Sequence, residues 1–166
     1  MNKKTLDASV FLNGDFIEFI TISRGMMGFA DPDVIPKHLP PDSTDEEIGY
    51  ATRKALSCSK RISAGEFQAL FKSGIVQKKM KEHEASSIQE HGYKSRRALY
   101  VNMKNCTVSQ REDRIEVQPM HHNSIDGFSA TKQDMSKMLI LNVDASDSEL
   151  GAAVKEGFDR CTSAWP

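Results

Sequence analysis

The sequence predicts an α+β fold, an antiparallel sheet with packed helices, in which two pseudo-repeated strand–helix halves are joined by a helical segment. Three observations indicate this arrangement. A strand–helix pattern occurs twice at an offset of 102 residues, strand-like stretches precede each copy, and residues 63–91 have helical spacing of apolar side chains. We expect a single domain over residues 1–166, with half-repeats at about 8–60 and 98–162 and a helical connector at 63–91.

The first half begins with a hairpin signal. Ser9–Leu12 and Phe16–Ile22 are strand-like and flank Asn13-Gly14. An Asn-Gly pair accepts the positive φ angles of a two-residue type I′ turn, so it predicts a tight hairpin. Residues 34–39 then predict a short strand that leads into a helix.

The repeat itself covers that helix. Asp42–Lys60 aligns with Asp144–Thr162, and the two segments share acidic, glycine and alanine positions: Asp42/Asp144, Asp45/Asp147, Glu47/Glu149, Gly49/Gly151 and Ala51/Ala153. A hydroxyl residue three positions before a glutamate starts each helix, at Thr44 and at Ser146, which is the pattern of a capping box. Glycine inside a helix costs about 1 kcal/mol relative to alanine. The matched glycines therefore predict that another backbone approaches closely.

The second half and the connector complete the predicted order. Strands are expected at Leu99–Met103, Cys106–Ser109 and Ile115–Val117, followed by a short strand at Met138–Leu141 before the second repeated helix. In the connector, Ser63 and Glu66 form a third capping-box pattern, Ser73-Gly74 predicts a helix end, and Ile75–Gln89 predicts a further helix.

Charge is unevenly distributed along a nearly neutral chain. The formal net charge is −1, but residues 31–47 carry −5, residues 144–159 carry −4, and residues 60–104 carry +6. A neutral total argues against a general nucleic-acid binder, which usually has a strongly basic face. Two interpretations of the acidic segments stay open: they cap and solvate helices, or they form an acidic face that docks a basic partner.

The chain lacks the motifs of catalysis, cofactor binding and metal binding. His121-His122 is the single histidine cluster in the sequence, and adjacent residues of an extended segment point to opposite sides. There is no Cys-x-x-Cys, no His-Glu-x-x-His, no glycine-rich phosphate loop and no nucleophile elbow. We therefore predict no catalytic residue, no cofactor, no metal site and no small-molecule substrate.

The remaining composition indicates a soluble protein of a reducing compartment. Three widely spaced cysteines do not suit a disulfide framework, and Cys58 and Cys161 are expected to be buried. Met26, Met27 and Phe29 are expected to form a lid on the core. The N-terminal residues lack the apolar region of a signal peptide, and no apolar run is long enough to span a bilayer.

Three segments carry a resemblance to a known family. His38–Lys60 (HLPPDSTDEEIGYATRKALSCSK), Tyr93–Val108 and Ile115–His122 resemble immunity proteins of bacterial contact-dependent growth inhibition (CDI) systems, and the resemblance covers about residues 10–162. It implies a cytoplasmic, non-enzymatic immunity-type domain that binds the C-terminal toxin domain of a cognate effector. In the most similar group, it implies that this toxin is a ribonuclease of the pancreatic-ribonuclease-like superfamily.

Combined with the charge pattern, the resemblance yields a predicted contact surface. Ribonucleases present cationic groups to RNA, so carboxylates can occupy or cover the active cleft. The predicted partner-binding residues come from the first acidic loop and from a long loop at 121–134: Asp31, Asp33, Asp42, His121, His122 and Asp126. The alternatives are an RNA-binding or scaffold module that uses the basic connector, and a small hydrolase or nuclease that uses His121 or His122.

Overall fold

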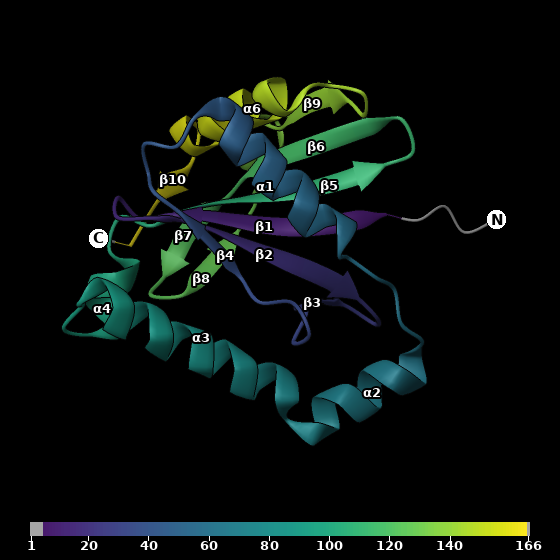
Figure 1. Ribbon diagram of the computed structural model, residues 1–166, viewed down its shortest axis with the longest axis vertical. Coiled ribbons are helices and arrows are strands. Elements are labelled where there is room, and N and C mark those ends of the chain that lie inside the picture. The colour runs from purple at the N-terminus through teal and green to yellow at the C-terminus, as the bar shows by residue number, and fades with distance from the viewer. Residues whose placement is uncertain (1–4, 166) are drawn as a thin grey trace.

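The computed structural model of the chain describes residues 5–165, so residues 1–4, the start of the segment predicted not to be a signal peptide, lie outside the described residues. The fold is α+β, as predicted (Figure 1). Within the described residues, an antiparallel sheet has the order β3-β2-β1-β5-β6-β9, and β4 also pairs with β2. Its strands are β1 (Leu6–Leu12), β2 (Ile17–Arg24), β3 (Gly28–Ala30), β4 (Lys37–Leu39), β5 (Lys104–Arg111), β6 (Arg114–Pro119) and β9 (Leu139–Asn142).

A second, small sheet and six helices complete the described part of the chain. The small sheet has the order β10-β7-β8, formed by β7 (His121–Ser124), β8 (Gly127–Ser129) and β10 (Thr162–Ser163). The helices are α1 (Asp45–Ser57), α2 (Ala64–Ser73), α3 (Ile75–His91), α4 (Arg96–Tyr100), α5 (Lys132–Met135) and α6 (Asp147–Asp159). No helix in residues 5–165 combines the length and apolar character that crossing a bilayer requires.

The two halves of the sheet have the same order of elements. β1 and β5 lie side by side at the centre, and each pairs with the next strand of its half, β2 or β6. Each of these outer strands pairs in turn with the short strand that precedes a helix, β4 before α1 and β9 before α6. Helices α1 and α6 pack against each other on one face of this sheet, with their first turns side by side (Figure 1).

The matched glycines confirm the predicted close approach of two backbones. A Cβ atom added at Gly49 would lie 1.8 Å from the Asp147 carbonyl oxygen, and one added at Gly151 would lie 1.7 Å from the Asp45 carbonyl oxygen. Reciprocal ion pairs flank this crossing, with Lys155 Nζ 2.7 Å from Asp45 Oδ1 and Arg53 Nε 3.0 Å from Asp147 Oδ1. The crossing of α1 and α6 therefore depends on the absence of a side chain at both glycines.

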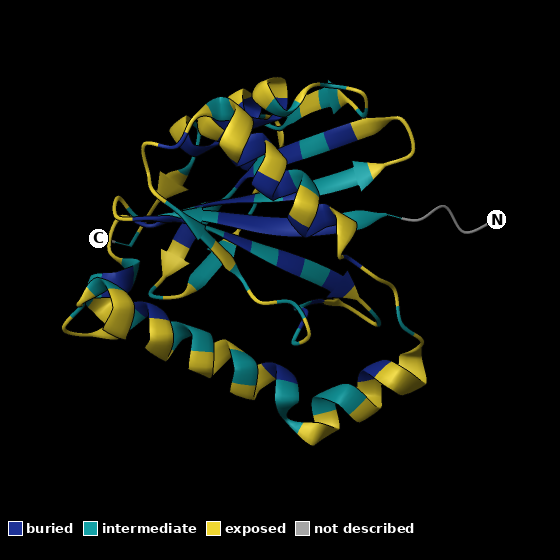
Figure 2. Ribbon diagram, viewed as in Figure 1, coloured by how far each residue is buried: buried dark blue, intermediate teal, exposed yellow. Residues whose placement is uncertain are grey.

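The main core lies between these two helices and one face of the sheet. Alternate residues of the strands are buried there, and the outer surfaces of the helices are exposed (Figure 2). The hydroxyl part of the predicted caps is present, because Thr44, Ser63 and Ser146 each accept a hydrogen bond from the backbone N–H three residues later. Buried apolar residues of the sheet and helices contribute, among them Val10, Phe19, Ile48, Leu56, Val108, Val117, Leu150 and Phe158.

The connector helices lie on the other side of the molecule. α2 ends where predicted, at Gly74 with φ of 78°, and α3 follows directly (Figure 1). Two smaller apolar clusters attach α3 near its ends. One contains Phe29, Phe67 and Val76, and the other is centred on Phe16. A cleft lies between these attachments.

Two local predictions of secondary structure are corrected. The hairpin is present, but its loop has four residues, 13–16, because the Asn13 side-chain oxygen accepts hydrogen bonds from the N–H groups of Asp15 and Phe16. Leu99–Met103 is not a strand. Ser95 caps the short helix α4 by accepting from the Ala98 N–H, and Leu99 is buried on that helix.

Two burial predictions are also corrected. Cys58 is exposed at the end of α1, whereas Cys161 is half-buried and packs against the main core. The predicted lid on the core is correct for Phe29, which is buried, but wrong for Met26 and Met27, which are 63% and 58% exposed. All three cysteines are free.

Candidate partner-binding surface

The first acidic loop contains one buried and two exposed aspartates of the predicted set. The Asp31 carboxylate is buried, accepting from the Ser23 hydroxyl at 2.6 Å and from the Asp33 N–H at 2.9 Å. Asp33 is exposed, with Oδ2 3.3 Å from Lys60 Nζ, and these aspartates raise the pKa of that lysine. Asp42 is exposed two residues before the cap of α1. Asp31 thus folds the loop, and Asp33 and Asp42 present carboxylates to solvent.

The segment 121–134 is not the long loop that the sequence predicts. It forms the β7–β8 hairpin and α5, because Phe128 packs edge-on against Phe11 at 5.6 Å and stacks on His122 at 4.3 Å. His122 is 1% exposed, and its Nε2 lies 3.0 Å from the Ile125 carbonyl oxygen, with no partner for Nδ1 in the described residues. His121 is half-buried, with Nδ1 2.6 Å from the Thr162 hydroxyl. These two histidines therefore hold the small sheet together.

Asp126 lies on the same hairpin and belongs to a charged network with residues of α3 and α4. Its Oδ2 lies 2.9 Å from Arg96 Nη2, and Arg96 also donates to both carboxylate oxygens of Glu84. The hydrogen bonds of Arg96 raise its pKa above the usual value, and the bond to Glu84 contributes more than the bond to Asp126. The guanidinium therefore stays charged. Burial raises the pKa of Tyr100, whose hydroxyl donates to Glu84. Asp126 already has an internal cation as its partner.

This network also neutralises part of the basic connector. Arg96 faces two carboxylates, the Arg97 guanidinium lies 4.9 Å from the centre of the Trp165 ring, and Lys79 pairs with Glu82 at 3.6 Å. A phosphate-binding surface requires cations directed at the ligand. The arrangement therefore does not favour the alternative of an RNA-binding module.

Residues 31–42, which we call the strap, separate two hollows. A cleft of about 690 Å³ lies between the strap, the sheet and α3, and a groove of about 490 Å³ lies between the strap and α1. Asp126 lines the cleft, whereas the other five predicted residues line neither hollow. The predicted set is thus not gathered in one site, since strap and β7–β8 hairpin are equivalent in chain order but not adjacent.

The groove beside the strap contains residues that the sequence reasoning missed. Ile35 and Tyr50 are 83% and 58% exposed, and both line the groove together with Glu47. Exposed aromatic and aliphatic anchors with charged neighbours are characteristic of protein interfaces. One sequence signal was available, because Tyr50 falls outside the apolar stripe of its helix at residues 48, 51, 55 and 56. We call the exposed residues Asp33, Ile35, Asp42, Glu47 and Tyr50 the strap face.

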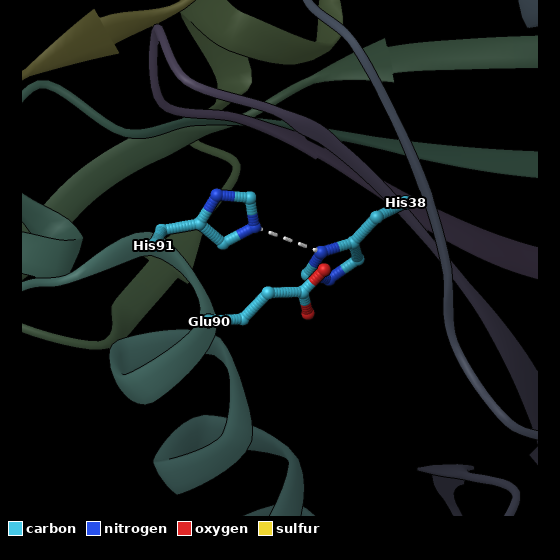
Figure 3. Close-up of side chains that lie close together, drawn as sticks. All are labelled: His38, Glu90 and His91. Atoms are coloured by element: carbon cyan, nitrogen blue, oxygen red, sulfur yellow. Dashed lines mark hydrogen bonds between the residues drawn. The ribbon is translucent and has the colours of Figure 1, made fainter.

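Three side chains of metal-ligating types also lie close together outside the predicted set. Nitrogen atoms of His38 and His91 and a carboxylate oxygen of Glu90 all lie within 4.8 Å of one another (Figure 3). His38 belongs to the strap and the other two end α3. The two histidines are 53 residues apart, so no local sequence motif predicts that they lie close together.

Comparison with known proteins gives a consistent assignment. Residues 6–161 match the model of the family described as CDI immunity protein. The chain is 29% identical over 170 residues to immunity protein CdiI-YPIII of Yersinia pseudotuberculosis serotype O:3, covering 95% of this chain and 96% of the relative.

Solved structures are similar over the same length. A CdiA-CT/CdiI toxin and immunity complex from Yersinia pseudotuberculosis contains a chain with a TM-score of 0.86 and 28% identity, covering 96% of this chain and 98% of that one. A Neisseria meningitidis protein of unknown function, NMB0488, has a TM-score of 0.88 and 24% identity, covering 97% and 98%, which shows the shared fold.

Proposed function

The chain belongs to the CDI immunity protein family, and from this we propose that it binds and neutralises the C-terminal toxin domain of its own cognate CDI effector. It is an immunity protein and not an enzyme. The observation that carries the proposal is the match of residues 6–161 to the family. The similarity to a chain solved as a toxin and immunity complex supports it. Three free cysteines support a cytoplasmic site of action, where thiols stay reduced.

The strap face is the proposed contact surface. It combines three exposed carboxylates, on Asp33, Asp42 and Glu47, with two exposed anchors, Ile35 and Tyr50. The anchors supply apolar area for burial, and the carboxylates supply attraction to a basic partner. A stable complex buries about 1,200–2,000 Å² in total, so the strap face would be the centre of a wider interface.

The remaining predicted residues are left out of this contact set for structural reasons. Asp31 and His122 are buried, and Asp126 is paired with Arg96. His121 is bonded to Thr162 across the small sheet. Removing the buried side chains of Asp31 or His122 would disturb the fold of the immunity protein before it changed the surface offered to a partner.

The finer proposal is that the toxin is a ribonuclease and that the strap face covers its active cleft. A ribonuclease binds a polyanion and needs cationic groups in that cleft. The exposed carboxylates of the strap face are complementary to such a cleft. Substrate RNA and immunity protein would then compete for the same surface.

Binding of variants to the purified cognate toxin domain tests the contact surface. The combined change Asp33→Lys, Asp42→Lys and Glu47→Lys should slow association by about 10-fold or more and flatten its salt dependence, because complementary charges on the two partners act mainly on the association rate. The matched control reverses three exposed acids away from the strap, Glu82→Lys, Asp113→Lys and Asp159→Lys, with the same change in net charge. Equal rates and equal salt dependence in the two variants would overturn the strap face as the contact surface.

Two further readouts separate the levels of the proposal. The toxin domain should cleave RNA, and one equivalent of this chain should stop cleavage. Cleavage of another substrate would overturn the ribonuclease assignment while leaving the immunity function intact. A non-cleavable oligonucleotide should displace the chain from the toxin, and formation of a ternary complex would overturn occlusion. Failure of the chain to bind its toxin at all would overturn the immunity function.

A further inference from the structure

The strap and the end of α3 meet through two histidine rings. His38 Nδ1 lies 3.3 Å from His91 Nε2, and the carboxylate of Glu90 lies beside them, so that one ligand atom from each residue is within 4.8 Å of the others (Figure 3). His38 and His91 are half-buried, and Glu90 is exposed. The three side chains come from two elements that are otherwise separated by the cleft.

The separation of the two nitrogen atoms suits a shared metal ion. Zinc binds histidine nitrogen at about 2.0–2.1 Å with tetrahedral geometry, and two such ligands are therefore about 3.3 Å apart. The observed 3.3 Å equals that separation. A neutral imidazole pair joined by one proton has a similar spacing, so titration with the metal ion distinguishes the two cases.

The outer contacts of His38 are those of a metal ligand. Its other ring nitrogen, Nε2, lies 2.6 Å from Glu18 Oε2. A carboxylate accepts and cannot donate, so it places the ring proton on Nε2 and leaves the Nδ1 lone pair directed at His91. Histidines that bind zinc almost always donate their second N–H to a carboxylate or carbonyl in this way.

One aromatic side chain packs against both imidazole rings. The ring of Phe16 stacks on His38 at 4.4 Å and on His91 at 4.4 Å, with interplanar angles of 5° and 25°. Phe16 is itself 2% exposed and belongs to the apolar cluster that attaches α3. The two imidazoles are therefore held in place without a metal, which lowers the entropic cost of binding one.

From this geometry we infer that His38, Glu90 and His91 form a binding site for a divalent transition metal ion of the zinc class, with Glu18 positioning His38. Two imidazoles and one carboxylate are the donor set of many three-ligand zinc sites, and they leave a fourth position for water. The bound ion would join the strap to the C-terminal end of α3. It would thereby close one end of the cleft and fix the segment that carries Asp33 and Ile35.

Titration of the full, metal-free chain with Zn²⁺ tests the site, with Co²⁺ as a spectroscopic probe. Calorimetry should give one equivalent of bound Zn²⁺, and Co²⁺ should show the visible absorption bands of a four-coordinate ion. Both titrations are performed in a Cys58→Ser background, because the exposed thiol of Cys58 is a competing ligand. Absence of binding at micromolar Zn²⁺ would overturn the inference.

Variants then assign the ligands. His91→Ala and Glu90→Gln should each weaken Zn²⁺ binding at least 10-fold, and Glu18→Gln should weaken it about 10–100-fold, the usual effect of an outer-shell carboxylate. His83→Ala, the same change on the same helix, is the matched control and should leave affinity unchanged. Glu90 is exposed, so Glu90→Gln should retain the unfolding midpoint of the metal-free protein and remain informative if His91→Ala misfolds. Full-affinity binding by Glu90→Gln and by the double variant His38→Ala, His91→Ala would overturn the site.

Discussion

Replacing Gly49 by alanine tests the packing on which the two halves of the fold depend. The added Cβ would lie 1.8 Å from the Asp147 carbonyl oxygen, and the neighbour is backbone, which cannot rotate out of the way as a side chain can. The hydrogen atom that glycine has in this direction points at the same oxygen, a contact of the weak Cα–H···O type. Alanine therefore forces the two helices apart.

The size of the effect follows from that distance. An ordinary carbon–oxygen contact of about 3.3 Å requires the backbones to separate by about 1.5 Å, against the close packing of the core beneath them. Overpacking typically costs about 1–3 kcal/mol, and a backbone clash belongs at the upper end of that range. Higher helix propensity returns up to about 1 kcal/mol. The expected net loss is about 2 kcal/mol, or about 4–8 °C in the unfolding temperature of a chain of this size.

Urea unfolding of three variants measures this loss of stability. Gly49→Ala should lower the midpoint without changing the dependence on urea, and Gly151→Ala should match it, because its Cβ would lie 1.7 Å from the Asp45 carbonyl oxygen. Gly65→Ala in α2 is the control, since a Cβ there meets nothing closer than 4.0 Å, and it should be neutral or stabilising.

The double variant carries the sharper test. One separation of α1 from α6 relieves both clashes, so the combined loss for Gly49→Ala and Gly151→Ala should be smaller than the sum of the two single losses. Additive losses would mean that the clashes relax independently. A Gly49→Ala protein as stable as Gly65→Ala would refute the close approach itself.

The remaining predictions concern single side chains. Hydrogen bonds from the N–H and hydroxyl of Thr131 lower the pKa of Asp134, so its stabilising effect should be present above about pH 4 and lost in acid; Asp134→Asn should accordingly destabilise the protein at pH 7, with a difference that shrinks as the pH falls. Burial raises the pKa of Tyr93 to about 12. Because the unfolded chain loses this proton near pH 10 and the folded chain does not, stability should fall between about pH 10 and 12, and less steeply in Tyr93→Phe. Asp31→Ala should cost about 1–3 kcal/mol by leaving buried partners unsatisfied, whereas the exposed Asp33→Ala should stay within about 0.5 kcal/mol, both measured by urea unfolding.

The parts of the fold that the sequence predicts are those in which one local pattern decides the outcome. Thr44 and Ser146 start helices because a hydroxyl satisfies free N–H groups wherever the chain enters a helix. Gly49 and Gly151 predicted a close helix crossing because glycine destabilises a helix, and close packing against another backbone can offset that loss. Neither inference requires knowledge of the rest of the molecule.

The parts that were missed depend on contacts between distant residues. His121–Ser124 has no strand-like alternation, and it forms a strand because Phe128 and β10 supply partners for it. Leu99 suggested a strand by composition, but the Ser95 cap and burial of Leu99 beside Phe16 decide for a helix. Long-range contacts override local propensity in the first case, whereas the second also depends on a local cap at Ser95 that the sequence prediction did not use.

The candidate surfaces were hard to predict because charge in a sequence does not reveal exposure. Asp31 and Asp33 are two residues apart in the same acidic loop, yet one carboxylate is 1% exposed and the other 78%. The Ser23 hydroxyl makes the difference, since it gives Asp31 a buried partner from a neighbouring strand. Hydrogen-bond partners decide which side chains of the strap are exposed. Asp31 and His38 attach the strap to strand β2 through Ser23 and Glu18, whereas Asp33, Ile35 and Asp42 are exposed to solvent. Substitutions of the outward side chains leave the bonds of Asp31 and His38 in place, so this fold can vary its proposed contact surface without rebuilding its core.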